Sequence, residues 1–477
     1  MRAGRIVVHP VLLAVYPVLF LYSRNRVEAG VDQVPWPMLL SVAGALLLWL
    51  VLAALIRHTR KSAAATTICL FFFFAYGHLH DLLQAWDLPG SRHSRLLPVM
   101  LLACGYSVYF VATARSAFEK ATSALNGAAI FLVLVNLGSA ALHWIGQPAL
   151  QADARPGPDV VTRSTTDSRV GYLPDIYYIV LDEYAHPDTM RQSYGYGDAP
   201  LVAHLKERGF FVASASQSPG HSSIRSIASV LNMEAVPAND TDEMVWGRIT
   251  DNRVTTFLRS RGYTVIYVGS WFDDGIYEAG ADTYRNFYSS GAGGRLSGAF
   301  PHTFWNTTML APFYDRLVRR HYETYYRGGL IATIDYLKEL PHVPGPKFVF
   351  AHVLCPHEPF VFGRGGEVVS PTNWNNYADK RHYLDQYIFI SGEMSQVVDS
   401  LLTRSASPPV IVVQSDHGIR AHHQGIQIGG EEWLKILNAY HAPGAEGIFS
   451  DDVSPVQTFR LILNHYFGTA GQVPGDR

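Results

Sequence analysis

Two apolar segments of the sequence end abruptly in polar residues that are able to bind a cation. The β-branched run 410–413 (VIVV) leads into Asp416 and His417, and the segment 176–181 (IYYIVL) leads into Asp182. In open α/β sheets, ligands bind outside the carboxyl ends of the strands, where carboxylates and imidazoles are well placed to share a metal ion. A strand-end turn with solvated polar residues explains the same residues, so both interpretations remain open at this point.

A third stretch, SPGHSSIRSIASVLNM (residues 218–233), predicts a helix that begins with hydroxyl groups. Its apolar residues have helical spacing, and Ser222 and Ser223 stand at the position of an N-cap. A hydroxyl there lies over unpaired N–H groups at the positive end of the helix dipole, which favours an anion such as phosphate. The serines either only cap the helix or, with a metal ion nearby, one of them serves as a nucleophile.

A fourth stretch, FVFAHVLCPHEPF (residues 348–360), contains two histidines. His352 lies within the apolar run, and we interpret it as a core histidine. His357 follows the run in a loop between Pro356 and Pro359, which favours a functional role because the prolines would hold the ring in place.

The composition predicts a membrane-anchored protein of more than one domain. Of the 477 residues, 48% are hydrophobic and 16% are charged, which is apolar for a soluble chain. The excess lies in five N-terminal segments that approach the ~20 residues needed to cross a bilayer. A signal peptide is the alternative for the first, but it has no small-residue cleavage site and four spans follow it. The predicted spans are 7–23, 36–56, 65–86, 95–112 and 124–145.

The distribution of basic residues predicts that the N-terminus is cytoplasmic and that the chain after about residue 146 is periplasmic or extracellular. We therefore expect a protein of the cell (inner) membrane. This orientation leaves Arg24, Arg26, Arg92 and Arg95 outside and places inside Arg2, Arg5, Arg57, Arg60, Lys61, Arg115 and Lys120. The net charge of −2, without a basic stripe, argues against nucleic acid as a partner. With Cys69 and Cys104 in predicted spans and Cys355 alone outside, we expect no disulfide.

The part of the chain after the predicted spans is predicted to form an α/β domain. A Pro-, Gly- and Ser-rich stretch separates it from the spans, which predicts a transmembrane anchor at 1–146, a linker at 147–173 and a catalytic domain at 174–477. Strand candidates alternate with helical stretches such as 380–403, which is typical of a mostly parallel sheet covered on both faces. The strand candidates are 176–181, 210–214, 264–269, 347–354, 410–414 and 437–442.

Taken in order, these motifs resemble the alkaline phosphatase and sulfatase superfamily. The pieces are a strand ending in VLDEY, the hydroxyl helix start SSIRSIAS, the CPHEPF segment and finally SDHG. With its N-terminal spans, the chain looks most similar to the membrane-anchored branch that includes lipoteichoic acid synthases and phosphoethanolamine transferases. The resemblance covers roughly residues 174 to 468 and implies an α/β/α sandwich with a mostly parallel, mixed sheet, following a five-helix transmembrane bundle.

The resemblance also implies site residues. Asp182, Asp416 and His417, with the hydroxyl of Ser223, would hold one divalent metal ion, and Ser223 would be the nucleophile, with Ser222 as the alternative. His357 would contact the phosphoryl oxygens or assist the leaving group. Mn or Zn suits this mixed oxygen and nitrogen set best, with Mg or Ca as further options. Candidate ligands for a second metal ion, whose placement does not match the family clearly, are His422, His423 and Asp385.

The chain departs from true sulfatases in one motif. In those enzymes the Cys or Ser of a short Cys/Ser-x-Pro-x-Arg motif is converted to formylglycine, whereas SSIRS has no proline at the required place. The sequence therefore predicts a metal-dependent phosphotransferase or hydrolase that acts on phosphate esters of lipid head groups or envelope glycans, with membrane lipids as partners. Hydrolysis of a phosphate or sulfuric ester without transfer is one alternative, and a catalytically silent scaffold in envelope assembly is another.

Overall fold

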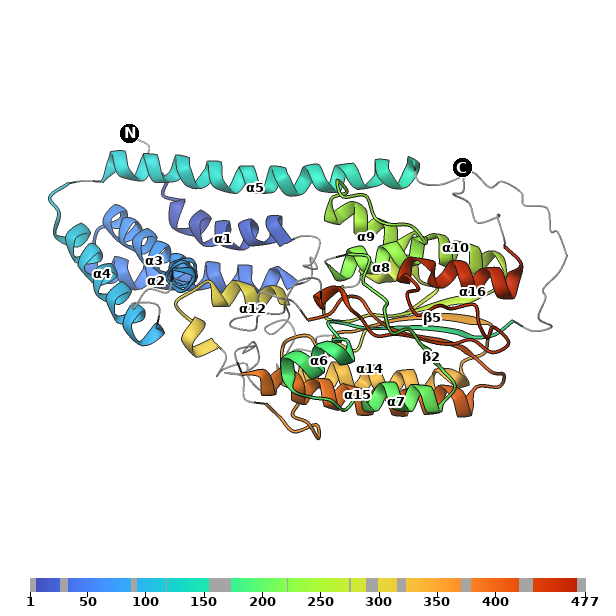
Figure 1. Cartoon of the computed structure of the whole chain (residues 1–477). Coiled ribbons are helices and arrows are strands. Elements are labelled where there is room, and N and C mark those ends of the chain that lie inside the picture. Colours follow the sequence, from blue (N-terminus) through green and yellow to red (C-terminus); the bar gives the residue numbers. More distant parts are fainter. Residues whose placement is uncertain are drawn as a thin grey trace. The chain divides into compact units, whose positions relative to one another are not determined.

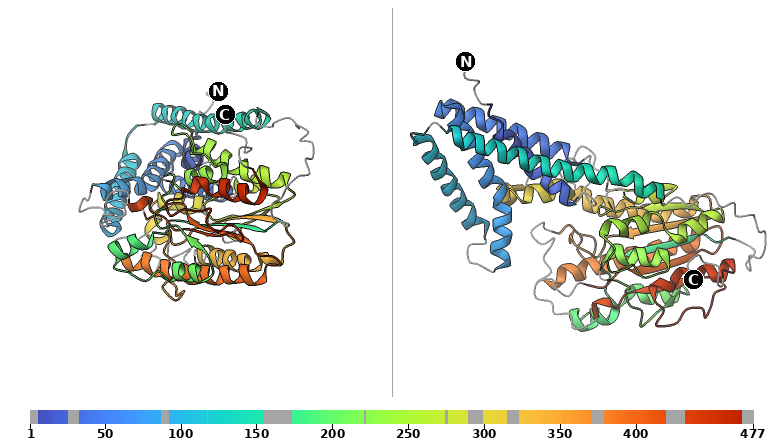
Figure 2. Two further views of the ribbon diagram at one scale, coloured as in Figure 1. Left: turned by 45° about the vertical axis from the view of Figure 1, so that its right-hand side comes forward. Right: turned by 90° about the horizontal axis from the view of Figure 1, so that it is seen from above.

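The computed structural model describes most of the chain, and it divides into two units. One unit, the membrane unit, is Met1–Thr162 with Ser290–His321, and the other, the catalytic unit, is Arg163–Ser289 with Tyr322–Arg477. Figures 1 and 2 show the helices and strands of both units. The described residues are 6–25, 33–86, 92–116, 118–153, 173–220, 222–273, 276–288, 299–314, 323–369, 379–419 and 432–469.

Five apolar helices form the first part of the membrane unit, in the segments predicted as spans. They are α1 (His9–Asn25), α2 (Pro35–Ile56), α3 (Thr59–Ala85), α4 (His93–Thr113) and α5 (Glu119–Asp153). Helices α2 to α5 are long and apolar enough to cross a membrane, whereas α1 has only 17 residues. Helix α5 also runs through the first residues of the predicted linker, as far as Asp153. The rest of that linker, residues 154–172, lies outside the described residues.

The catalytic unit is built around a seven-stranded sheet in the order β2-β7-β6-β1-β5-β3-β4. The pairs β1–β5, β1–β6, β3–β5 and β3–β4 are parallel, while β6–β7 and β2–β7 are antiparallel. The predicted mostly parallel, mixed sheet is therefore confirmed. The strands are β1 (Ile176–Leu181), β2 (Phe211–Val212), β3 (Thr264–Val268), β4 (Thr283–Arg285), β5 (Lys347–Val353), β6 (Val410–Ser415) and β7 (Asn438–His441).

Helices cover both faces of this sheet (Figure 1). Helices α8, α9, α10 and α16 lie on one face, and α6, α7, α14 and α15 lie on the other. Every residue of β1, β5 and β6 is buried, as expected for central strands of a sheet covered on both sides. The helices of this unit are α6 (Pro187–Tyr194), α7 (Pro200–Glu207), α8 (Ser223–Asn232), α9 (Asp242–Thr250), α10 (Arg253–Ser260), α14 (Gly329–Glu339), α15 (Lys380–Arg404) and α16 (Thr458–Phe467).

A segment from the second half of the chain packs against the membrane helices. Helix α12 (Ala299–Asn306) and the turn after it stand in sequence between β4 and α14, yet they belong to the membrane unit. The N–H of Gly77 in α3 donates to the carbonyl of Thr307 (2.9 Å), and the carbonyl of Phe73 accepts from Met309 N–H (3.0 Å). In a regular helix these two groups of α3 would pair with each other, so the segment is anchored at one turn of α3.

Gly77 is what allows the two backbones to approach so closely. A Cβ atom at this position would lie 2.5 Å from the carbonyl oxygen of Asn306 and nearer still to Thr307 Cα. These are backbone atoms of Asn306 and Thr307, so no side-chain rotation can make room for a methyl group. The contact therefore depends on glycine at this position.

We predict that Gly77→Ala loosens the segment 299–314 from α3. Overpacking of this kind costs about 1–3 kcal/mol, which corresponds to about 5- to 150-fold faster exchange of the Met309 amide if exchange proceeds by local opening. Hydrogen exchange of the full-length protein in nanodiscs measures this rate. Gly105→Ala in α4 is the matched control, because a Cβ at Gly105 would meet nothing within 4 Å. Equal exchange in the two variants would show that the contact contributes nothing.

Two of the three cysteines are neighbours in the membrane unit. All three are free thiols, but the Sγ atoms of Cys69 and Cys104 lie 3.7 Å apart between α3 and α4. This proximity was not predicted, because it depends on how the two helices are rotated against each other.

Candidate metal centre and active site

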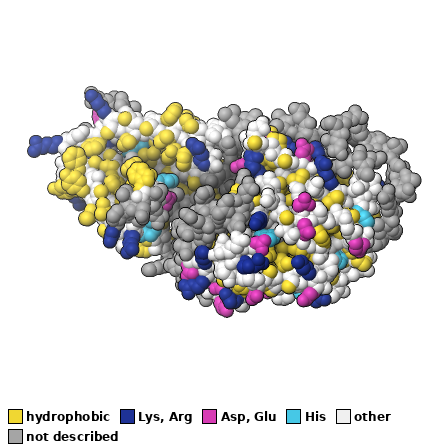
Figure 3. Space-filling model, viewed as in Figure 1, with side chains coloured by type: hydrophobic (Ala, Val, Ile, Leu, Met, Phe, Trp, Pro, Cys, Tyr) yellow, Lys and Arg dark blue, Asp and Glu magenta, His cyan; other side chains and the backbone are white. Residues whose placement is uncertain are grey.

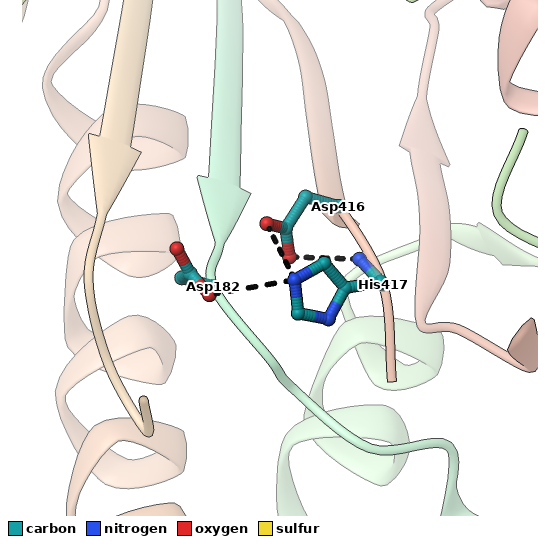
Figure 4. Close-up of side chains that lie close together, drawn as sticks. All are labelled: Asp182, Asp416 and His417. Atoms are coloured by element: carbon teal, nitrogen blue, oxygen red, sulfur yellow. Dashed lines mark hydrogen bonds and ion pairs between the residues drawn. The ribbon is translucent and has the colours of Figure 1, made fainter. Parts of the chain in front are cut away.

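Parallel pairing in register brings the predicted ligands together at one edge of the sheet. Leu181 at the end of β1 is paired with Val353 on β5 and with Ser415 on β6, so all three strands end at the same level. The next residues along the chain, Asp182 after β1 and Asp416 after β6, therefore lie side by side (Figure 4). Candidate ligand atoms of Asp182, Asp416 and His417 all lie within 4.8 Å of one another, and all three residues are buried.

Each carboxylate has one oxygen held by hydrogen bonds and one without a hydrogen-bond partner. Asp416 Oδ1 accepts from the backbone N–H of Glu183 (3.0 Å) and of His417 (2.7 Å). Asp182 Oδ2 accepts from His352 Nε2 (3.2 Å) and from Ser223 Oγ (3.3 Å). The other oxygens, Asp182 Oδ1 and Asp416 Oδ2, are buried without a hydrogen-bond partner in the part of the chain that the structure describes. Because such groups are costly to bury, the arrangement favours a cation between them.

The ring of His417 is oriented so that a nitrogen lone pair faces the same space. Its Nδ1 lies 2.8 Å from the carbonyl of Gly418, which only accepts, so Nδ1 carries the hydrogen. In the neutral ring, Nε2 is then free to bind a metal ion, and it lies 3.5 Å from Asp416 Oδ2 and 4.0 Å from Asp182 Oδ1. A histidine that binds a metal ion through one ring nitrogen usually donates the N–H of the other nitrogen to a carbonyl or a carboxylate, as His417 does here.

The charges of this cluster shift the pKa values of its members. Burial raises the pKa of the Asp416 carboxyl, and the nearby Asp182 carboxylate raises it further. Burial also raises the pKa of Asp182, but the neighbouring His357 and His352 outweigh this and hold it below its usual range. For His417 burial lowers the pKa, while the carboxylates of Asp416 and Asp182 raise it above its ordinary value. The two acids therefore compete for the same positive charge, which a divalent cation would supply to both.

The hydroxyl at the start of α8 reaches the same space. Ser222 is the N-cap, with an extended backbone and no capping hydrogen bond from its side chain, and Ser223 is the first helical residue. Ser223 Oγ lies 3.3 Å from Asp182 Oδ2 and 3.4 Å from His417 Nε2. The geometry thus brings Ser223 to the cluster, and the first-turn N–H groups of α8 remain available for an anion.

A second serine, which the sequence analysis did not identify, connects α8 to the end of β6. Ser218 Oγ donates to the backbone carbonyl of Asp416 (2.6 Å) and lies 3.0 Å from Ser226 Oγ on α8. These contacts hold the start of α8 at a fixed distance from the end of β6, where the candidate metal ligands lie. The residues SPG (218–220) before the helix predict only a turn, so no local pattern indicates this role of Ser218.

His352 lies in the core as predicted, but it has a more specific role than packing. Because a carboxylate oxygen only accepts, the His352 Nε2–H donates to Asp182 Oδ2, and Nδ1 lies 3.3 Å from the hydroxyl of Tyr277. The ring therefore holds one oxygen of Asp182 and leaves the other directed at the cluster. The interpretation of His352 as only a core histidine was incomplete, because β5 places it beside the end of β1.

His357 is fixed next to the cluster by its backbone. Its N–H donates to the carbonyl of Asp182 (3.3 Å), and its ring Nδ1–H donates to the carbonyl of Glu358 (2.6 Å). Burial lowers the pKa of the His357 ring, but the carboxylates of Asp182 and Glu183 raise it to a net value above its ordinary one. The ring is therefore suited to holding a proton beside an anionic group.

The second set of candidate ligands does not join the cluster. Asp385, on α15, is partly exposed and forms an ion pair with Arg364 (3.3 Å). His422 and His423 lie outside the described residues. Within the described part of the chain, the geometry supports one metal ion.

A buried pair of carboxylates, an imidazole and a helix-start hydroxyl at the carboxyl edge of a mostly parallel sheet define an α/β protein of the alkaline-phosphatase type. Comparison with protein families agrees, since residues 174–444, more than half of the chain, match the sulfatase family. The protein therefore belongs to the sulfatase family, which confirms the predicted resemblance. No curated protein matches the chain in a sequence comparison.

Solved structures similar to the chain are remote in sequence. The C-terminal periplasmic domain of phosphoethanolamine transferase EptC from Campylobacter jejuni is 12% identical, with 62% of this chain and 90% of that chain covered and a TM-score of 0.40. The corresponding domain of EcEptC from Escherichia coli, in complex with Zn, is 11% identical (63% and 84% covered, TM-score 0.40). The soluble domain of lipooligosaccharide phosphoethanolamine transferase A from Neisseria meningitidis is 14% identical (63% and 90% covered, TM-score 0.39). The family match, and not these remote likenesses, assigns the chain to its family.

We predict that Asp416→Asn weakens metal binding while the fold is retained. The amide oxygen still accepts from the N–H groups of Glu183 and His417, but the negative charge of one ligand is lost. The loss of affinity should exceed the about 10- to 100-fold that follows removal of an outer-shell partner. Elemental analysis of the full-length protein after equilibration with a series of free Zn²⁺ concentrations measures it. Asp385→Asn, in the surface ion pair, is the control and should bind as the wild type does; equal binding by Asp416→Asn would exclude the site.

Proposed function

We propose that the protein is a membrane-anchored, metal-dependent phosphotransferase or hydrolase that uses Ser223 as its nucleophile. The observation that carries the proposal is the position of Ser223 Oγ, 3.3 Å from Asp182 Oδ2 and 3.4 Å from His417 Nε2, at the N-terminus of α8. The N-cap of α8 is Ser222, so a capping role does not explain the position of the Ser223 hydroxyl. Instead it faces two residues suited to hold a metal ion, over N–H groups suited to bind a phosphate.

The residues present fit a divalent metal ion. Asp182 Oδ1, Asp416 Oδ2, His417 Nε2 and Ser223 Oγ would hold it, and this mixed set suits Mn or Zn better than Ca. When bound, such an ion lowers the pKa of the serine hydroxyl and neutralises charge on the phosphoryl oxygens.

Two displacements at phosphorus complete the proposed reaction. Ser223 attacks the phosphorus atom as its alkoxide, so that a new O–P bond forms as the bond to the leaving alkoxide breaks, and the His357 imidazolium gives that leaving alkoxide its proton. The N–H groups at the start of α8 donate to the phosphoryl oxygens. A water molecule or an acceptor hydroxyl then loses its proton to His357 and attacks the phosphoserine, which releases Ser223. Hydrolase and transferase use the same residues and differ only in this acceptor.

The membrane anchor narrows the choice of substrate. Four helices long and apolar enough to cross a bilayer precede the catalytic unit in the chain, which keeps that unit near a membrane surface. The distribution of basic residues places it on the periplasmic or extracellular side of the cell membrane. Phosphate esters of lipid head groups or of envelope glycans are the substrates within reach there. A silent scaffold is disfavoured because it would not require a free hydroxyl at the metal-binding cluster.

We predict a covalent phospho-adduct on the peptide that contains Ser223. Mass spectrometry of the full-length protein, loaded with metal and incubated with phospholipids, measures the adduct and the mass of the transferred group. Ser223→Ala should abolish it, while Ser223→Thr should retain it because the side chain supplies the same oxygen. Ser222→Ala is the matched control and should retain the adduct. An adduct lost in Ser222→Ala but kept in Ser223→Ala would overturn the assignment of the nucleophile.

We predict that the effect of His357→Gln depends on the leaving group. Alkoxide leaving groups need a proton, so cleavage of an alkyl phosphodiester should slow by about 10²- to 10⁴-fold. A p-nitrophenolate leaves without protonation, and formation of the phosphoserine from a p-nitrophenyl ester should therefore be much less affected. Pre-steady-state release of the two leaving groups measures the difference. An equal loss on both substrates would assign His357 to binding instead of proton transfer.

A further inference from the structure

The membrane unit contains a large apolar cavity that has no part in the chemistry described above. Its volume is about 750 Å³, within the range of about 300–1,000 Å³ typical of small-molecule sites. Its lining comes from α2, α3, α4 and the segment after α12, and it consists of Leu40, Ser41, Gly44, Ala45, Leu48, Cys69, Leu70, Phe73, Phe74, Leu101, Cys104, Trp305, Met309, Leu310 and Tyr314.

The cavity opens on a surface suited to a hydrocarbon environment. Leu40, Leu101 and Leu310 line it and are also 40%, 55% and 38% exposed, so its mouth lies at the surface of the unit. Hydrophobic side chains gather over the N-terminal helices in Figure 3. Because α2, α3 and α4 have the length and composition of membrane spans, this surface faces lipid chains and not water.

One wall of the cavity is the segment 305–314, which is fixed to α3. The hydrogen bonds of Gly77 and Phe73 hold its backbone, and the rings of Phe74 and Phe304 pack with their centres 5.8 Å apart. In the chain, this segment lies between β4 and α14 of the catalytic unit. An occupant of the cavity therefore contacts a part of the chain that is connected at both ends to the catalytic unit.

A single unpaired hydroxyl distinguishes this cavity from a simple packing defect. Ser41 is 7% exposed, and its Oγ has no hydrogen-bond partner among the described residues. It lies about 9 Å along α2 from the start of that helix at Pro35, near the end that the positive-inside distribution places outside. An unpaired hydroxyl in an apolar lining is satisfied by an occupant that is apolar over most of its length and carries one hydrogen-bond acceptor.

We propose that this cavity binds one hydrocarbon chain of an outer-leaflet ester lipid, whose carbonyl accepts a hydrogen bond from Ser41 Oγ. This inference rests on the proposed function, and it identifies the lipid as the substrate that carries the phosphate ester. A hydrocarbon chain with an ester at one end matches both the apolar lining and the unpaired hydroxyl of Ser41. The backbone carbonyls of a helix from a second copy of this chain are already used within that helix, so an ester carbonyl is the better acceptor for Ser41.

Photo-crosslinking of the full-length protein tests this proposal. The probe is a glycerophospholipid with a diazirine on one ester-linked chain, present as a minor component of phosphatidylglycerol nanodiscs. We expect labels on α2 and on the segment 305–314. Gly44→Leu fills the cavity, because a Cβ at Gly44 meets nothing within 4 Å, and should reduce these labels about tenfold. Gly105→Leu, on a helix that also lines the cavity but at a position outside the lining, is the matched control and should leave them unchanged.

A second variant keeps the test valid even if Gly44→Leu fails to fold. Ser41→Ala should weaken competition by an unlabelled ester lipid about threefold and leave competition by the ether-linked analogue, which lacks the carbonyl, unchanged. Labels of equal strength in wild type and Gly44→Leu, or crosslinks between two protein copies at the cavity in place of lipid, would overturn the proposal.

Hydrolysis of the soluble diester bis(p-nitrophenyl) phosphate separates this proposal from the function on which it rests. The reaction involves no hydrocarbon chain and should depend on Ser223. If the wild type labels at the cavity but does not cleave this diester in a Ser223-dependent way, the proposed function fails while the lipid site stands. Cleavage without labels at the cavity overturns the lipid site alone.

Discussion

The arrangement of the catalytic unit depends on two carboxylates that are almost fully removed from water. Asp182 and Asp416 are 2% and 3% exposed, and each has an oxygen without a hydrogen-bond partner among the described residues. Burying unpaired charge is expensive, so the fold must supply compensation. Donors from Glu183, His352 and His417 satisfy the other oxygens, and the remaining charge calls for a cation.

The same constraint explains why the surrounding elements are placed as they are. Strands β1, β5 and β6 must end at one level so that their final residues meet, and the parallel register achieves this. Ser218 then ties α8 to the end of β6, so that Ser223 stands at a fixed position beside the charges. The candidate site residues come from four separate parts of the sequence, but they all lie at one edge of the sheet.

Most strands of the sheet and the candidate metal ligands could be predicted from the sequence, because short local patterns indicate them. Fully buried parallel strands are short apolar runs, so β1, β3, β5 and β6 could be located to within a residue or two of their observed ends. Asp182, Asp416 and His417 could be predicted as ligands because they directly follow β1 and β6, and the carboxyl ends of parallel strands lie at the same edge of a sheet. The three-residue strand β4 was missed because so short a run has no recognisable pattern.

What the sequence could not provide are contacts between residues far apart in the chain. His352 bonds to a residue 170 positions away, and Ser218 bonds to one 198 positions away, so neither role leaves a local pattern. The same holds for the segment after α12, which packs on α3 through backbone atoms and requires glycine at position 77. The direction of the Ser223 side chain, toward Asp182 and His417, likewise does not follow from residue spacing.

We propose that Asp182, Asp416, His417 and Ser223 together hold a single metal ion. Anomalous diffraction from crystals of the protein grown with Mn or Zn, recorded on both sides of the absorption edge of that metal, locates the ion. We expect one strong anomalous peak in the catalytic unit, within bonding distance of these four side chains. A peak elsewhere with none at these residues, or two peaks of equal strength sharing them, would show that the four side chains do not form a single-metal site.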